Sequence, residues 1–287
     1  MNLRKSVPIF TGVITIILTL SAITLYSQGQ GSKYYPKGNP EKWNCSLTPF
    51  LLAPIIDGHV QSKNLSEDFG IGTADFIKTL HGTFMMAAEV SRGKFFAAPL
   101  YIYTYNEIEK SIWTTDNGFS SVSANPSMKK SIFELKSGMR LRLNENLIVD
   151  PYVGFRYTYY YIFGSVNGIK NYSEINEKEY FFDPIFGIQA HYYFNPRFPI
   201  EFRADCGGFG VGSKFTWSVN LNGGYTVSPT TDLLIGFAAL ENQYENETSS
   251  GDAYGMTSLI YGINFGARFY IPKRFRDPLF FKNKKVE

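Results

Sequence analysis

The sequence predicts an all-β protein: an antiparallel up-and-down transmembrane β-barrel of about ten strands, within a range of roughly 8–12. The clearest support is the segment 132–163, where apolar residues alternate with polar or charged ones on both sides of a short turn at 144–146. Because side chains of a strand point to opposite faces with period two, this segment is expected to form a hairpin with one apolar face. Each arm suits the roughly 9–11 residues that a tilted strand needs to cross a bilayer.

The composition supports a membrane barrel. The chain of 287 residues contains 25 Phe and 20 Tyr, which fits an outer surface that contacts lipid and its interfaces. After its first residues the chain has no apolar run of about 18 residues, so an α-helical membrane protein is not expected. A net charge of +3 is too small to indicate a nucleic-acid binder. The expected partners are outer-membrane lipid and, during biogenesis, the barrel-assembly machinery, with no nucleic acid and no defined oligomeric state.

The beginning of the chain reads as an export signal. Arg4 and Lys5 precede an apolar stretch at 9–26, and small or polar residues follow it. An uncleaved membrane anchor is the alternative, because the apolar stretch is long for a signal peptide. The expected segments are a cleaved signal peptide at 1–27, a polar linker at 28–42, the barrel at 43–271 and a basic periplasmic tail at 272–287. This organisation predicts a multi-pass protein of the bacterial outer membrane.

Ten strands are expected from the alternation, joined by short turns near Gly93, Glu145, Pro196 and Pro229. In order, they are 43–54, 83–92, 95–107, 133–143, 149–163, 181–194, 200–206, 215–227, 231–244 and 259–271. The facing of 95–107 is left open because both of its sides are apolar. Longer loops are expected at 55–82, 107–130, 166–180 and 246–252, and the first could contain a helical turn at 73–80 with Thr73 as its N-cap. Short turns on one side and long loops on the other are typical of outer-membrane meanders.

The polar face of these strands is expected to line the lumen. A soluble, lipocalin-like barrel with its apolar face inside is the alternative, but glycines such as Gly138, Gly154 and Gly187 on the polar face suit a crowded interior better than a solvated surface. The charges on this face are also balanced, so they can pair across a narrow lumen. The residues expected in this ion-pair network are Glu89, Glu134, Lys136, Arg140, Arg142, Asp150, Arg156, Asp183, Glu201, Arg203, Asp205 and Arg268.

Several segments resemble a known family. The runs Thr48-Pro49-Phe50, Asp150-Pro151-Tyr152-Val153-Gly154 and Gly207-Gly208-Phe209-Gly210-Val211-Gly212-Ser213 look like those of small outer-membrane β-barrel proteins of Gram-negative bacteria, of the OmpA-like and OmpW-like kind. The resemblance implies a fold and a location, since most such proteins have no assigned activity. The last strand resembles a barrel-assembly signal, although 16 residues follow it here.

The expected function is that of a non-enzymatic barrel with a narrow lumen, structural or permitting limited passage of small solutes. An outer-membrane hydrolase using His59 or His81, beside Asp57 and Asp75 in the first long loop, is one alternative. A surface-binding or adhesion barrel is another. His191 is expected to hydrogen-bond to lumen neighbours. We expect no catalytic residue, no cofactor and no metal site, because no ligand pair has suitable spacing.

Two further features have structural interpretations. The segment 207–212 is expected to be a tight bend between strands rather than a phosphate loop, because no helix follows it. Cys45 and Cys206 lie on strands far apart in the chain and are expected to point outward, so a disulfide between them is not expected.

Overall fold

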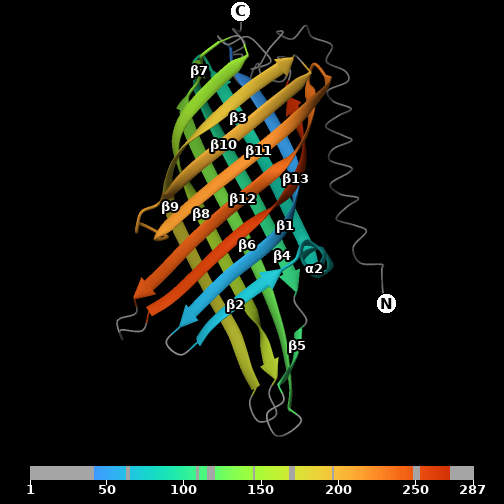
Figure 1. Ribbon diagram of the computed structural model, residues 1–287, viewed down its shortest axis with the longest axis vertical. Helices are drawn as coiled ribbons and strands as arrows, with labels where there is room; N and C mark the ends of the chain where they lie inside the picture. Colours follow the sequence, from blue (N-terminus) through green and yellow to red (C-terminus); the bar gives the residue numbers. More distant parts are fainter. Residues whose placement is uncertain are drawn as a thin grey trace, which may run out of the picture.

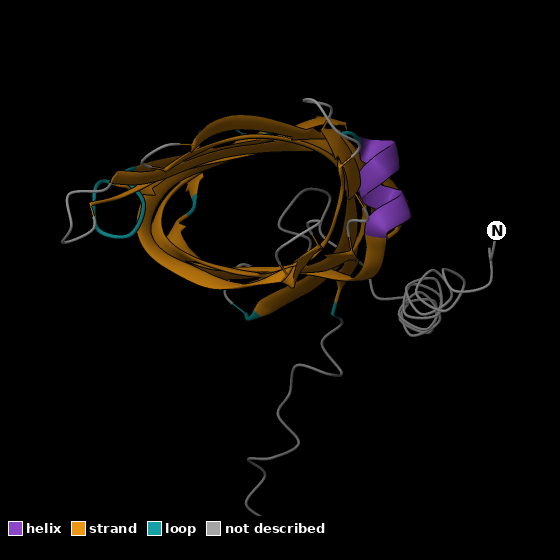
Figure 2. Cartoon of the chain, turned by 90° about the horizontal axis from the view of Figure 1, so that it is seen from below, coloured by secondary structure: helices purple, strands orange, loops and turns teal. Residues whose placement is uncertain are grey.

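The chain folds into a single closed barrel. The computed structural model describes residues 42–62, 65–107, 110–114, 120–144, 146–167, 172–195, 197–247 and 253–271. They form one antiparallel sheet that closes into a ten-strand barrel (Figure 1), and a view from one end shows the wall surrounding a lumen (Figure 2). The predicted fold class is thereby confirmed. The predicted signal peptide, linker and basic tail lie outside the described residues.

Ten long strands make the wall, each paired with its neighbours, and β13 closes the ring on β1. They are β1 (Asn44–Ser62), β3 (Leu80–Arg92), β4 (Phe95–Glu107), β6 (Ser120–Met139), β8 (Leu147–Asn167), β9 (Tyr172–Asn195), β10 (Phe198–Gly208), β11 (Phe215–Ser228), β12 (Thr231–Glu247) and β13 (Ala253–Tyr270). Three short strands pair at their margins: β2 (Leu65–Ile71) with β1, β5 (Lys110–Thr114) with β6, and β7 (Leu141–Arg142) with β8.

The strands are longer than predicted at the end with the long connections. The predicted loop 107–130 contains β5 and the first half of β6, and the predicted loop 166–180 is largely strand from β8 and β9. The reason is that alternation of apolar and polar residues marks only the part of a strand that has lipid on one side. Beyond the lipid both faces meet polar surroundings, so backbone pairing continues without the sequence signal.

The structure settles the facing of β4, which the sequence left open. Phe96, Leu100 and Asn106 are buried, whereas Phe95 and Tyr101 are exposed on the outside. The even positions of β4 therefore line the lumen, and a large part of that lining is apolar.

A short helix, α2 (Thr73–Thr79), lies where β1 and β3 separate. β1 pairs with β3 only from Asn44 to Pro49, and pairing of β1 on this edge resumes at Ile56, now with β2. Proline has no N–H to donate, which suits the end of a ladder. The hydroxyl of Thr73 donates to the carbonyl of Pro54 at 3.0 Å. The helix was predicted, but Thr73 as its N-cap was wrong, because the N-cap is Gly72.

Glycines on the inner face make room for a large ring. Tyr152 points into the lumen and is buried. A Cβ at Gly187 would lie 2.8 Å from Cζ of Tyr152, and a Cβ at Gly138 would lie 2.9 Å from its Cβ. The link predicted at 207–212 is a tight bend at 209–214, because Gly207 and Gly208 belong to β10; Gly208 has φ 87° and Gly210 has φ 79°.

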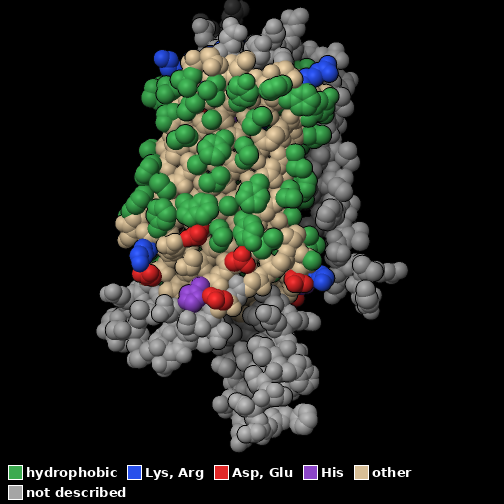
Figure 3. All heavy atoms as spheres, in the orientation of Figure 1, with side chains coloured by type: hydrophobic (Ala, Val, Ile, Leu, Met, Phe, Trp, Pro, Cys, Tyr) green, Lys and Arg blue, Asp and Glu red, His purple; other side chains and the backbone are tan. Residues whose placement is uncertain are grey.

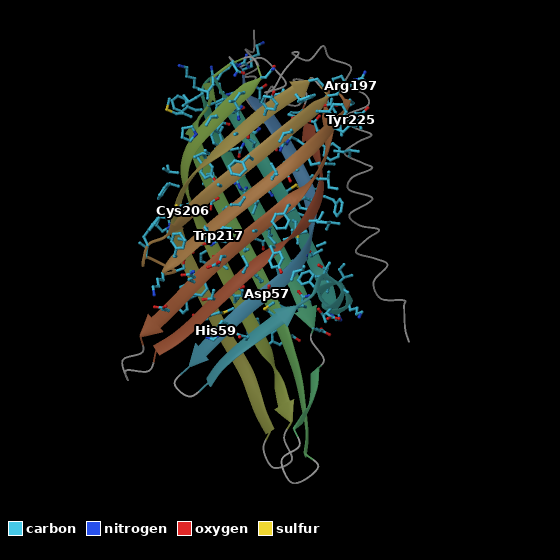
Figure 4. The ribbon with its side chains drawn as sticks, in the orientation of Figure 1. Asp57, His59, Arg197, Cys206, Trp217 and Tyr225 are labelled. Atoms are coloured by element: carbon cyan, nitrogen blue, oxygen red, sulfur yellow. The ribbon has the colours of Figure 1, made fainter. Side chains whose placement is uncertain are left out.

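Apolar side chains cover the middle of the outer wall, and charged side chains gather at the two ends of the visible face (Figure 3). Figure 4 places Arg197 and Tyr225 near the upper end, and Asp57 and His59 in the lower half, above the lower ends of the longest strands. Large apolar residues on the outside include Phe182, Phe186, Leu221, Ile235, Ile263 and Phe265. Such a belt is what a barrel wall presents to hydrocarbon.

None of the helices in the described part of the chain has both the length and the apolar character needed to cross a bilayer.

Substitution of Leu221 by Arg should lower the free energy of unfolding by about 2–4 kcal/mol, because the residue lies mid-strand on the lipid face of β11. Val227 lies on the same strand and face but beside the turn at 229–230, so Val227→Arg should cost only about 0–1 kcal/mol. Urea titration of the protein folded into lipid vesicles measures both. Equal losses in the two variants would contradict this placement of the membrane.

Candidate functional site

The lumen near the short turns is crossed by a group of ion pairs centred on Arg140. Its Nη2 lies 2.9 Å from Oε1 of Glu89 on β3 and 3.2 Å from Oδ2 of Asp150 on β8. Arg140 follows the end of β6, and all three side chains are mostly or fully buried. Arginine carries five donors in a planar fork, so it can hold two carboxylates on different strands at once.

His191 extends this group towards β10. Its Nε2 lies 3.4 Å from Oδ2 of Asp150, and its Nδ1 lies 3.6 Å from Oε1 of Glu201. Glu201 in turn pairs with Arg268 on β13. These contacts make a continuous chain of charged groups from β13 to β3. His191 therefore contacts lumen neighbours, among them the amide nitrogen of Gln189 at 2.7 Å.

A second tier of the network is centred on Arg156, whose side chain is fully buried. Its Nε donates to Oε1 of Glu134 at 2.8 Å, and its Nη2 donates to Oδ1 of Asp205 at 2.8 Å. Glu134 also lies 3.5 Å from the amino group of Lys136. Asp205 accepts a further hydrogen bond from the hydroxyl of Tyr152 at 2.9 Å. Arg156 on β8 thus joins β6 to β10 through the interior of the barrel.

Three of the predicted network residues stand apart from these pairs. Asp183 accepts hydrogen bonds from the backbone N–H and the hydroxyl of Ser213, at 2.6 and 2.8 Å. Arg203 lines the lumen but makes no hydrogen bond or ion pair with a residue in the described ranges. Arg142 was predicted to lie in the lumen, whereas it is exposed next to the turn at 144–146. β6 ends at Met139 and Arg142 lies in the separate short strand β7, where both residues are exposed, so the alternation of β6 no longer places its side chain inside.

The sequence reading missed two buried charged residues. Lys130 on β6 is 5% exposed, and its amino group lies 4.6 Å from the ring centroid of Tyr160. Asp232 on β12 accepts hydrogen bonds from the hydroxyls of Thr226 and Tyr270, at 2.6 and 2.8 Å. Continuing the alternation backwards from 132 would have placed Lys130 on the lumen face.

Beside the network the lumen contains a cavity of about 210 Å³. Charged side chains of β6 and β10 line one side of it, whereas the other side is apolar. The apolar lining comes mainly from β1, β3, β4 and β12, and includes Leu52, Ile56, Met85, Leu100, Ile132 and Leu234. The polar face was expected to line the lumen, but part of the lining is apolar, because the inner positions 50–56 of β1 and 96–102 of β4 are apolar as well as the outer ones.

The two histidines proposed for hydrolysis lie on strands rather than in a loop. Nδ1 of His59, on β1, lies 2.7 Å from Oδ1 of Asp68 on β2, and Figure 4 shows His59 on the outer wall near Asp57. Nε2 of His81, on β3, lies 3.1 Å from Oε2 of Glu107. The described residues include no group of three or more His, Cys, Asp or Glu placed to hold a metal ion. Cys45 and Cys206 are both free thiols.

Comparison with solved structures agrees with this architecture. The outer membrane protease OmpT from Escherichia coli superposes with a TM-score of 0.53 at 12% identity, covering 85% of this chain and 100% of that one. The fold is that of an outer-membrane β-barrel. The Yersinia pestis attachment invasion locus protein Ail (TM-score 0.29, 9% identity, 77% of this chain and 99% of that chain) and the Pseudomonas putida toluene transporter TodX (0.31, 8%, 83% and 96%) are more distant. No family model and no curated protein matches the sequence.

Substitution of Arg156 by Met should lower the free energy of unfolding by about 3–5 kcal/mol, because Glu134 and Asp205 would lose a buried partner. Arg142 lies exposed at the turn, so Arg142→Met should cost no more than about 1 kcal/mol. Denaturant titration of both variants in vesicles checks this. If the two losses were the same, Arg156 would not be the centre of the network.

Proposed function

We propose that the protein is a non-enzymatic barrel of the bacterial outer membrane, inserted after export, whose lumen is closed to free diffusion by its ion-pair network. The observation that carries the proposal is the position of Arg156. Its guanidinium is fully buried inside the barrel and bonded to side chains of β6, β10 and β11, the last through the hydroxyl of Thr216 at 2.9 Å. A hydrated ion could pass this level only by separating these pairs.

The size of the barrel supports the same conclusion. Wide aqueous channels belong to barrels of about 16 strands or more, and small barrels fill their interior with side chains. The pairs of Arg140 and the contacts of His191 add a second obstruction nearer to the short turns. The role we propose is therefore structural, or limited to slow passage of small solutes, and its immediate partners are membrane lipid and the machinery that inserts barrels.

Purified protein in a planar lipid bilayer should show no steady conductance. The double variant Glu89→Ala/Arg140→Ala should also stay silent, because the tier centred on Arg156 still closes the lumen. Replacing Glu134, Arg156 and Asp205 by Ala as well removes both tiers and should add small conductance steps. Arg197→Ala, at an exposed turn position, serves as the control and should stay silent. Steady conductance of the wild-type protein would contradict a closed lumen.

A hydrolase is the second candidate, because His59 and Asp68 form a His–carboxylate pair with 2.7 Å between Nδ1 and Oδ1 at the end of the barrel with the long connections. OmpT, which shares the fold, is described as a protease. The adhesion alternative depends on connections of which 108–109, 115–119, 168–171 and 248–252 lie outside the described residues.

We expect the wild-type protein to hydrolyse neither peptide nor ester substrates beyond the rate of a mock preparation. The double variant His59→Ala/His81→Ala should give the same rate. Turnover by the wild-type protein that this double variant abolishes would replace our proposal with the hydrolase.

A further inference from the structure

A row of alternating tyrosines and lysines crosses the outer wall at the end of the barrel with the long connections. In the strand registers, Tyr105 of β4 lies opposite Lys129 of β6. Lys129 lies opposite Tyr161 of β8, which in turn lies opposite Lys178 of β9. Lys130, the next residue of β6, is buried on the lumen face, and successive side chains of a strand point to opposite faces. The row therefore belongs to the outer surface.

The rows beside this one place it at the edge of the apolar belt. Two positions along each strand towards the short turns, the side chains are Tyr103, Ser131, Tyr159 and Tyr180. The next two rows are Tyr101, Phe133, Tyr157 and Phe182, and then Pro99, Leu135, Phe155 and Pro184. Tyrosine is enriched where the membrane meets water, so this gradient marks the interface. The two lysines of the first row lie at its polar side, where lipid headgroups are.

Both ammonium groups contact aromatic rings rather than carboxylates. Nζ of Lys129 lies 5.1 Å from the ring centroid of Tyr105 and 5.2 Å from that of Phe163. Nζ of Lys178 lies 5.1 Å from the centroid of Tyr161, whose ring stacks on Phe163 at 4.8 Å. Neither lysine has an ion pair within the described part of the chain. A ring face attracts an ammonium group but leaves most of its N–H donors without an acceptor, so both lysines can still bind an anion.

The carboxylate of Glu107, two positions beyond Tyr105 on the same face of β4, is already engaged. It accepts a hydrogen bond from the hydroxyl of Tyr105. Its Oε2 also lies 3.1 Å from Nε2 of His81. It therefore does not neutralise Lys129.

Two other exposed lysines at this end show the contrast. Nζ of Lys214, in the bend before β11, lies 2.8 Å from Oε1 of Glu245. Nζ of Lys78 lies 3.4 Å from Oδ1 of Asp75, on the helix that Figure 2 shows outside the ring. These two lysines already have a negative partner from the protein itself, so they offer an internal control.

We propose that Lys129 and Lys178 bind the phosphate groups of anionic lipids in the membrane leaflet at the end with the long connections. The phosphate accepts charge-assisted hydrogen bonds from the ammonium groups, and the acyl chains lie along the aromatic rows beside them. Neighbouring strands lie about 4.8 Å apart, so only one strand, β8, separates the two flexible lysine side chains. The inference rests on the proposed membrane location and does not depend on whether the lumen is closed.

Native mass spectrometry of the full chain tests the proposal. The protein is released from detergent micelles that contain equal amounts of phosphatidylglycerol and phosphatidylcholine with the same acyl chains, and the retained molecules of each lipid are counted. Phosphatidylglycerol carries a net negative charge on its phosphate, whereas choline neutralises the phosphate of the other lipid. The wild-type protein should retain phosphatidylglycerol at least fivefold over phosphatidylcholine.

Two double variants with the same change in net charge locate the site. Lys129→Met/Lys178→Met should reduce the preference for phosphatidylglycerol to less than twofold. Lys78→Met/Lys214→Met should leave the preference within twofold of the wild-type value, because these lysines are paired with carboxylates.

Three results would overturn the proposal: equal retention of both lipids by the wild-type protein, an unchanged preference in Lys129→Met/Lys178→Met, or the same loss in both double variants. If the first double variant did not fold, the single variants Lys129→Met and Lys178→Met would decide, because each should lower the preference at least twofold. Failure of the wild-type protein to insert into lipid vesicles would contradict the membrane location itself. Insertion without a lipid preference would remove this inference alone.

Discussion

Charged groups enclosed by ten strands cannot be solvated as they would be in bulk water, and the rest of the interior follows from that constraint. An isolated buried charge costs several kcal/mol or more, so each carboxylate near the middle of the lumen needs a cation or several donors. Arg156 meets this need for Glu134 and Asp205 at once. The glycines facing Tyr152 belong to the same arrangement, because they let its ring fit inside while its hydroxyl reaches Asp205.

The sequence predicted the strands and their facing correctly wherever a strand has lipid on one side, because apolar and polar residues alternate there. Alternation placed Phe133 and Leu135 outside and Glu134 and Lys136 inside, and the structure has them there. It failed where that contrast disappears. Residues 110–114 and 120–130 form strands, but their sequence lacks the alternation that would have predicted them. In β4 the alternation is hidden because both faces carry apolar residues.

The ion pairs inside the barrel were harder to predict from the sequence. Which side chains meet across a lumen depends on the tilt and stagger of the strands, and the alternation of residues gives no information about either. The alternation along each strand assigns Arg156 and Asp205 to the inner face. Only the closed barrel shows that Nη2 of Arg156 lies 2.8 Å from Oδ1 of Asp205. Arg203 shares that face but reaches no carboxylate within ion-pair distance in the described residues. The apolar part of the lumen lining was not predicted, because an apolar residue such as Leu52 or Leu100 suits the lipid face as well as the lumen. The structure shows that both line the cavity.

The join between β1 and β3 has a mechanical implication. It is the shortest ladder among the described wall strands, from Asn44↔Ser91 to Pro49↔Met86, whereas β8 and β9 stay paired from Leu147↔Tyr192 to Asn167↔Tyr172. Separating β1 from β3 breaks fewer backbone hydrogen bonds than separating any other neighbouring pair among the described wall strands. β1 and β3 both contribute to the apolar lining of the cavity, and Phe76 of α2 lines the same cavity.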